Sequence, residues 1–295
     1  MSAFTFNNPI PEEYLKPSAK PGRTELVSYD IPNSENPSET ITKHARVYLP
    51  YGYDSGASRR YNVLYLMHGA GDDHNRWLGT DENPSDFRPL LDNMIANGDI
   101  EPIIVVTPCI EEGKQWFAVT LPSFHTEFET ALMPLVEGKY RTYAEGDSPD
   151  RFKASRDHRA YAGFSLGSAA TWFAFVNNLD CVKWFLPMSG DCWAVEKMGG
   201  KSATEATAAL LAKVAVDSGL SQRDYFIFAG NGTKDVAYPT LTPQIEAMKK
   251  HTEAFTFTDT SFDDGNLAYY LRENYEHEYS FVYEYFYNGI KHFFK

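Results

Sequence analysis

Basic residues are scarce in this sequence relative to acidic ones. It contains 27 Lys and Arg against 40 Asp and Glu, which gives a formal net charge of -13. Such a charge repels nucleic-acid phosphates and anionic lipid surfaces, so binding to either would need a local basic patch. The densest group of basic side chains, in residues 151–159, is interrupted by Asp157 and preceded by Asp150. We therefore expect neither nucleic acid nor a membrane as a partner.

Cysteine is also scarce, and long apolar runs are missing. Cys109, Cys181 and Cys192 cannot all pair within one chain, and none has a metal-ligand spacing. We expect no disulfide framework and no metal site. The three cysteines still allow one disulfide bond. No stretch of about 18 apolar residues occurs, and residues 1–20 lack a basic segment followed by an apolar run. As given, the chain is predicted to be soluble without an export signal, although a processed mature domain would look the same.

Length and hydrophobic pattern favour one large domain. The chain has 295 residues and 43% hydrophobic content, enough for a single core spanning residues 1–295. Residues 1–40 are rich in Pro, Ser, Asn and Glu and are predicted to form an N-terminal arm packed on that domain, with one strand at 24–31. Further buried strands are predicted at 46–49, 63–67, 103–107, 160–163, 184–188, 225–229 and 267–271.

Segments with helical periodicity alternate with these strands. Apolar residues from Phe87 to Ile95 form one stripe, which Gly98 should end, and another runs from Tyr279 to Phe293. Ser202 with Glu205 is typical of a capping box that opens a third helix. This alternation predicts an α/β fold with a mostly parallel central sheet between two helical layers, an α/β/α sandwich.

A nucleophile elbow is predicted at Gly163-Phe164-Ser165-Leu166-Gly167. The G-x-S-x-G pattern holds a serine on a sharp turn from strand to helix, and here a predicted strand precedes it and a predicted helix follows. The pattern alone also arises by chance in a chain with 20 glycines. Its position between strand and helix favours Ser165 as a catalytic nucleophile in an α/β-hydrolase fold.

The segment His68-Gly69-Ala70-Gly71 follows a predicted strand well before the serine. In α/β-hydrolases such a loop supplies one backbone N–H group of the oxyanion hole, and the residue after the nucleophile supplies the other. We assign these donors to Ala70 and Leu166. His68 precedes the serine in the chain, so we expect it to hold the loop through hydrogen bonds.

The acid and the base should follow later strands, in the chain order serine, acid, histidine. Asp235 lies in a turn after the predicted strand 225–229, and Asp191 follows the preceding strand as a second candidate. We favour Asp235 as the acid. His277 follows the last predicted strand and is favoured as the base, whereas His251 and His292 lie in predicted helices and suit structural roles. Chemistry through these three residues needs no cofactor.

Several motifs resemble those of a known family. The run 163–167, its continuation to Thr171 and Trp172, and the segment 187–193 resemble the feruloyl esterase domains of bacterial cellulosomal xylanases, in carbohydrate esterase family 1. Residues 48–53, 65–69, 104–108 and 243–248 extend the likeness over nearly the whole chain. Residues 273–277 depart from the family, because relatives are often glycine-rich before the catalytic histidine.

The resemblance implies hydrolysis of ferulate or related hydroxycinnamate esters on feruloylated xylan or xylo-oligosaccharides. It also implies a catalytic triad of Ser165, Asp235 and His277, with Trp193 at the acyl pocket, and a secreted or extracellular enzyme. We expect Asp191 and Trp116 beside the substrate as well. The given chain by itself leaves a cytoplasmic location open, as well as the oligomeric state.

The sequence leaves alternatives to this function. An acetylxylan esterase or a general carboxylesterase would use the same three residues, because the triad serves any acyl group that fits the pocket. An acyltransferase of the same fold would transfer the acyl group to a sugar. A carbohydrate-binding protein without catalysis would be expected to lack a triad residue or an oxyanion glycine, and none is missing here.

Overall fold

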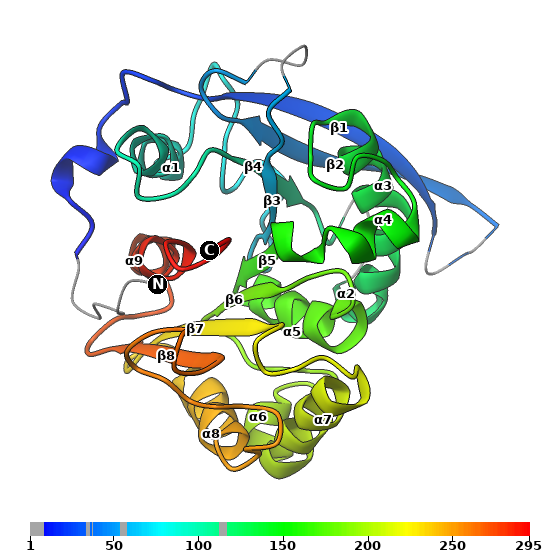
Figure 1. The fold of residues 1–295 in the computed structure, drawn as a ribbon, viewed down its shortest axis with the longest axis vertical. Helices are drawn as coiled ribbons and strands as arrows, with labels where there is room; N and C mark the ends of the chain where they lie inside the picture. The colour runs from blue at the N-terminus through cyan, green and yellow to red at the C-terminus, as the bar shows by residue number, and fades with distance from the viewer. Residues whose placement is uncertain (1–8, 34–35, 37, 54–57, 112–116) are drawn as a thin grey trace.

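One sheet forms the centre of the structure (Figure 1). The protein is represented by a computed structural model, which describes residues 9–33, 36, 38–53, 58–111 and 117–295. Within these residues the sheet has eight strands. They are β1 (Arg23–Pro32), β2 (Thr40–Leu49), β3 (Asn62–Met67), β4 (Ile103–Pro108), β5 (Arg159–Phe164), β6 (Trp184–Met188), β7 (Phe226–Gly232) and β8 (Leu267–Arg272).

The strand order is β1-β2-β4-β3-β5-β6-β7-β8, and all pairs from β4 to β8 are parallel. β1 and β2 are antiparallel to their neighbours and form one edge. Strands β4 to β7 are buried along their whole length, as their continuous apolar runs predict for a parallel sheet covered on both faces. Since parallel strands end at one edge, the loops after β5, β7 and β8 lie along the same side of the sheet.

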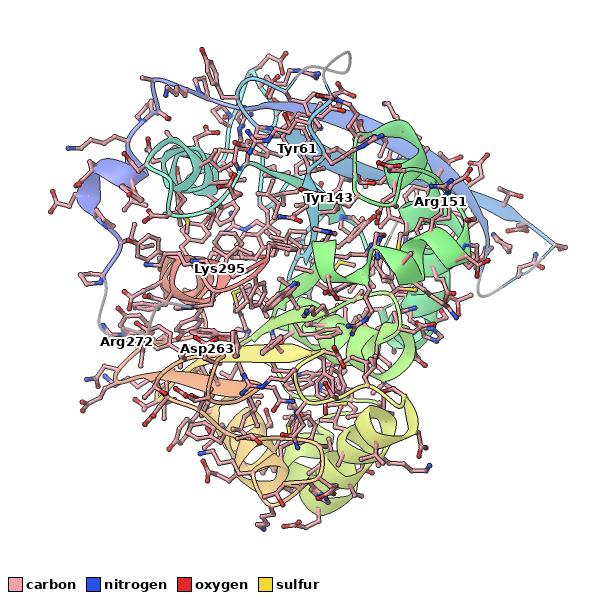
Figure 2. The ribbon with its side chains drawn as sticks, viewed as in Figure 1. Tyr61, Tyr143, Arg151, Asp263, Arg272 and Lys295 are labelled. Atoms are coloured by element: carbon pink, nitrogen blue, oxygen red, sulfur yellow. The ribbon has the colours of Figure 1, made fainter. Side chains whose placement is uncertain are left out.

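Helices cover both faces, so the predicted three-layer arrangement is confirmed (Figure 1). Figure 2 shows side chains filling the space between the sheet and α9. One face packs against α1 (Phe87–Ala96) and α9 (Tyr279–Ile290). The other packs against α2 (Phe117–Glu127), η2 (Phe128–Leu132), α3 (Met133–Lys139), α5 (Leu166–Asn178), α7 (Thr204–Asp217) and α8 (Tyr238–Met248). Shorter helices are η1 (Glu12–Leu15), α4 (Pro149–Ala154), η3 (Arg156–His158) and α6 (Gly199–Ser202).

Local sequence signals place one helix end correctly and one incorrectly. The α1 stripe is buried, and the helix ends just before Gly98, whose φ of 78° suits a glycine after a helix. The capping box at Ser202 and Glu205 was wrong. α7 begins after Ala203 without a side-chain cap, and the Ser202 hydroxyl donates to Met198 O instead, because Ser202 ends the short helix α6.

The N-terminal segment packs on the domain and also supplies one strand of the central sheet. β1 pairs with β2 over ten residues and closes one edge of the sheet. Before it, residues 12–16 lie across α1, where the Asn93 side-chain amide donates to the carbonyl oxygens of Tyr14 and Lys16.

The three cysteines are buried free thiols. Within the ranges given above, no helix combines the length and apolarity needed to cross a membrane.

A buried ion pair anchors the start of β5. The Arg159 guanidinium donates two hydrogen bonds to the Glu137 carboxylate, at 2.5 and 2.7 Å, and both side chains are 1% exposed. Its remaining donors reach Phe152 O, Cys181 O and Ser155 Oγ. The charge is therefore fully hydrogen-bonded, which is the condition under which a buried pair is tolerated.

Removal of Glu137 should be strongly destabilising. In Glu137→Ala the Arg159 charge stays buried without its partner, which costs about 3–5 kcal/mol of unfolding free energy. Chemical denaturation followed by circular dichroism measures this. As a matched control, Glu101→Ala removes the partner of Arg59 in an exposed pair and should cost less than about 1 kcal/mol. Equal losses in the two variants would contradict the special role of the buried pair.

Candidate active site

Ser165 occupies a strained turn between β5 and α5. Its φ of 57° and ψ of -113° lie outside the regions that residues other than glycine normally adopt. Both flanking glycines are required by close packing. A Cβ atom on Gly163 would lie 2.3 Å from Gly167 O, and one on Gly167 would lie 2.5 Å from Met67 O. The turn therefore presses the start of α5 against β5 and the end of β3, as the nucleophile-elbow motif predicts.

His277 and Asp235 form a chain of hydrogen bonds with Ser165. His277 Nε2 lies 2.8 Å from Ser165 Oγ, and His277 Nδ1 lies 2.7 Å from Asp235 Oδ1. A carboxylate only accepts hydrogen bonds, so Nδ1 carries the proton and Nε2 accepts from the serine hydroxyl. The Asp235 side chain is fully buried, and its Oδ1 also accepts from Ala237 N at 2.7 Å.

The loops that carry the acid and the base are joined to each other. Lys234 N donates to Tyr275 O at 3.1 Å, and Asn274 N donates to Thr233 Oγ1 at 2.9 Å. Asn274 has a φ of 65°, a left-handed conformation that asparagine tolerates better than most residues. This conformation lets residues 273–277 turn toward Ser165 without a glycine.

Asp191, the second candidate acid, lies elsewhere. Its Oδ1 accepts from Trp193 Nε1 at 3.1 Å and its Oδ2 accepts from Gly200 N at 2.8 Å. The residue is 3% exposed. Both carboxylate oxygens are thus occupied in fixing Trp193 and the start of α6, and Asp235 is the carboxylate that contacts His277.

The two residues predicted to donate to an oxyanion come from the start of α5 and the loop after β3, which pack together at Gly167. Leu166 is the first residue of α5, where N–H groups have no acceptor within the helix, and Ala70 lies in the loop after β3. His68 fixes this loop: its Nδ1 bonds Gly69 O at 2.6 Å and its Nε2 accepts from Ile110 N at 3.3 Å. Burial lowers the pKa of His68, which favours the neutral ring that these two bonds require.

Tyr279 links the loop after β3 to the loop that carries His277. Its hydroxyl accepts from Gly69 N at 2.9 Å and donates to Asp72 Oδ2 at 2.8 Å. The ring packs edge-to-face on Phe164, with centroids 4.7 Å apart, and Phe164 also contacts the His277 ring at 4.6 Å. The sequence indicates for Tyr279 only that it begins the apolar stripe of a helix. No local pattern predicts a contact across more than 200 residues.

An apolar hollow is lined by side chains of α2, α5 and the loop after β6. Ser165 N donates to Met188 O, and the loop that follows β6 leads to Trp193. Trp193, Phe117 and Phe173 line a hollow of about 200 Å³, and Lys197 Nζ lies 5.5 Å from the ring centroids of both Trp193 and Phe117. Trp116 lies outside the described residues.

Comparison with known proteins identifies the family. Residues 41–287 match the family model described as putative esterase. The chain belongs to this esterase family. The esterase is 39% identical over 286 residues to endo-1,4-beta-xylanase Y of Acetivibrio thermocellus, an alignment that covers 97% of the chain and 24% of the relative. The chain therefore spans about a quarter of that relative's length.

Solved structures agree with this assignment. A mutant feruloyl esterase module from Clostridium thermocellum in complex with sinapinate is 38% identical, with a TM-score of 0.85 over 100% of this chain and 95% of that one. A ferulic acid esterase from the fungus Anaeromyces mucronatus is 14% identical, with a TM-score of 0.67 over 96% of each chain, and shows the fold alone. The predicted α/β-hydrolase fold and the resemblance to feruloyl esterases are confirmed.

Asp235 and Asp191 should differ sharply in their effect on ester hydrolysis. In Asp235→Asn the side chain no longer fixes the Nδ1–H tautomer of His277, so kcat should fall by about 10⁴. Asp191→Asn keeps the oxygen that Trp193 needs and should have a much smaller effect. Steady-state kinetics on one ester measures both, and the reverse ranking would contradict the contact between Asp235 and His277.

Tyr279→Phe should lower kcat while leaving KM for a small ester nearly unchanged. The change leaves Gly69 N–H without its acceptor and frees the loop after β3, and one lost buried hydrogen bond corresponds to about tenfold in rate. Tyr287→Phe is the matched control, because Tyr287 lies farther along α9, where its ring packs on Tyr14. A wild-type kcat in Tyr279→Phe would show that the loop holds its position without this hydroxyl.

Proposed function

We propose that the chain is a serine esterase that releases ferulic or related hydroxycinnamic acids from feruloylated xylan. The hydrogen-bonded chain from Ser165 through His277 to Asp235 is the observation that carries this proposal. The strong similarity to a feruloyl esterase module over the full length of the chain supports the choice of acyl group.

Catalysis begins with proton transfer. His277 Nε2 takes the proton of Ser165 Oγ as the oxygen attacks the ester carbonyl, and Asp235 stabilises the imidazolium that forms. The N–H groups of Ala70 and Leu166 donate to the oxyanion of the tetrahedral intermediate, where the N-terminal end of α5 adds a favourable dipole.

Collapse of that intermediate releases the alcohol. His277 returns its proton to the leaving oxygen, and the acyl group stays on Ser165 as an ester. Water then attacks this acyl-enzyme with His277 as general base, and a second tetrahedral intermediate releases the acid. Every step uses side chains and backbone groups of the chain, and none requires a cofactor or a metal ion.

The apolar hollow at Trp193 suits the aromatic part of a hydroxycinnamate. A flat ring gains contacts with Trp193, Phe117 and Phe173, each worth about 0.5–1.5 kcal/mol beyond its burial. The Lys197 ammonium beside these rings can donate to an oxygen substituent of the acid. Acetyl groups gain nothing from such contacts. A xylan substrate also implies that the enzyme works outside the cell, since the polymer cannot enter it.

The first experiment compares products from two substrates. Methyl ferulate and acetylated xylan are incubated with the protein and with Ser165→Ala, and chromatography quantifies ferulic and acetic acid. Ferulic acid should be released by the wild type alone. Acetic acid as the main product would favour the acetylxylan esterase, and transfer of the feruloyl group to added sugar would favour the acyltransferase. Turnover by Ser165→Ala would overturn the serine mechanism.

Trp193→Ala should show whether this residue determines the preference for an aromatic acyl group or only supports the structure of the site. It should reduce kcat/KM for methyl ferulate by about tenfold, because a ring contact and its burial are lost, and reduce kcat/KM for 4-nitrophenyl acetate much less. Steady-state kinetics on the two esters measures the difference. If both values fell equally, Trp193 would support the site as a structural residue and the aromatic preference would need another origin.

A further inference from the structure

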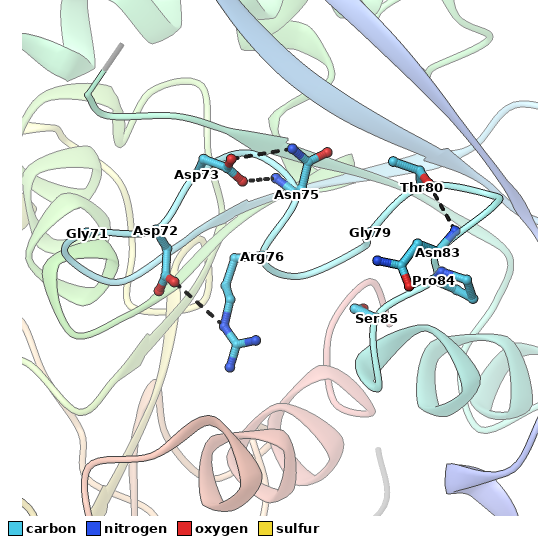
Figure 3. A pocket seen from close by; sticks show the side chains of 10 residues that line it. All are labelled: Gly71, Asp72, Asp73, Asn75, Arg76, Gly79, Thr80, Asn83, Pro84 and Ser85. Atoms are coloured by element: carbon cyan, nitrogen blue, oxygen red, sulfur yellow. Dashed lines mark hydrogen bonds and ion pairs between the residues drawn. The ribbon is translucent and has the colours of Figure 1, made fainter. Parts of the chain in front are cut away.

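A second depression, lined by both polar and aromatic side chains, adjoins His277. One hollow of about 500 Å³ is lined by His277, Phe164 and Tyr279 and reaches Arg76. A neighbouring hollow of about 620 Å³ is lined by the loop from Gly71 to Ser85 and also includes Arg76 (Figure 3). The two hollows share Arg76, and we call them together the Arg76 groove.

The position of the groove relates to the direction of the reaction. An ester has an acyl side and an alcohol side, and His277 must give its proton to the alcohol oxygen as that oxygen leaves. The alcohol therefore departs past His277, and the Arg76 groove is the open surface that His277 itself lines. The acyl group then lies toward the apolar hollow at Trp193.

Contacts fix the Arg76 side chain but leave most of its N–H donors without a close acceptor among the described residues. Its guanidinium lies 3.9 Å from the centroid of the Tyr279 ring, and its Nε is 3.8 Å from Asp72 Oδ1. Figure 3 shows the side chain extending from the loop into the depression, with Asp72 at its side. The side chain is still 40% exposed. Arginine carries five N–H donors, so a single long ion pair leaves most of them for a ligand.

The chemistry of the lining selects a class of alcohol. Carboxylates of Asp73 and Asp86 accept hydrogen bonds, the amide of Asn83 both donates and accepts, and Arg76 donates. Acidic groups outnumber the one arginine, which disfavours an anion, and an alkyl chain would leave the polar side chains of the lining without hydrogen-bond partners. A neutral molecule with many hydroxyl groups, each able to donate and accept, fits this surface best.

We propose that the Arg76 groove binds the carbohydrate side of the substrate, with Arg76 donating hydrogen bonds to sugar hydroxyl groups next to the ester. This inference rests on the proposed function. It adds a specificity-determining residue on the alcohol side of the ester, separate from the aromatic contacts on the acyl side.

Two feruloyl esters that differ only in the alcohol test the groove. kcat/KM is measured for methyl ferulate and for a feruloylated arabinoxylo-oligosaccharide, and the ratio of the two values is compared among variants. Effects on the triad, on Tyr279 or on the acyl hollow act on both esters and cancel in the ratio. Arg76→Ala should lower the ratio of oligosaccharide to methyl ester by about tenfold, the loss expected for one hydrogen bond to a charged group.

Arg76→Gln provides a second variant in case Arg76→Ala fails to fold, since it keeps a planar group and an aliphatic stem over Tyr279. Arg60→Ala, which removes an exposed arginine paired with Glu145, is the matched control and should leave the ratio unchanged. If the ratio falls less than about threefold in the folded Arg76 variants, the proposal that the Arg76 groove binds the carbohydrate is wrong. Failure of the wild type to hydrolyse methyl ferulate would instead overturn the proposed function itself.

Discussion

The close contact between the start of α5 and the ends of β5 and β3 is the constraint on which the site depends. Gly167 packs against Met67 O and His68 O, so closely that a Cβ atom would overlap both. This contact forces Ser165 into its strained turn and at the same time brings the loop after β3 next to the first N–H groups of α5. Ser165 and the proposed oxyanion donors are therefore placed by one packing interaction between backbones.

The acid and the base reach Ser165 because the sheet is parallel from β4 to β8, which puts the loops after β5, β7 and β8 at one edge. Hydrogen bonds between those loops then fix their geometry. Lys234 N and Asn274 N join the acid turn to the histidine loop, and Tyr279 joins the histidine loop to Gly69. Each catalytic group thus has a supporting partner in a neighbouring loop, which is how a site is held rigid enough for catalysis.

The parts of this arrangement that sequence reasoning predicted are those with a short-range signature. The elbow at Ser165 has fixed glycines, and apolar runs identify the buried strands. β2 was predicted too short, since its first residues form a half-exposed edge with polar side chains and no apolar run. The role of Tyr279 could not be predicted, because it arises from a contact that only the folded chain creates. Asp235 was preferred to Asp191 because of the order of serine, acid and histidine along chains of this fold. The contact of Asp235 with His277 is seen only in the structure.

The hollow at Trp193 and the Arg76 groove differ in chemical character, and this difference suits the two halves of an ester between an aromatic acid and a sugar. Aromatic rings around Trp193 form the smaller, apolar hollow, whereas Arg76 and carboxylates lie in the wider groove. Tyr279 lies at the boundary, because its hydroxyl holds Gly69 while its ring supports the guanidinium of Arg76. The hydroxyl of Tyr279 thus supports the oxyanion loop, while its ring supports the arginine proposed to contact the carbohydrate, so one side chain serves both parts of the proposed site.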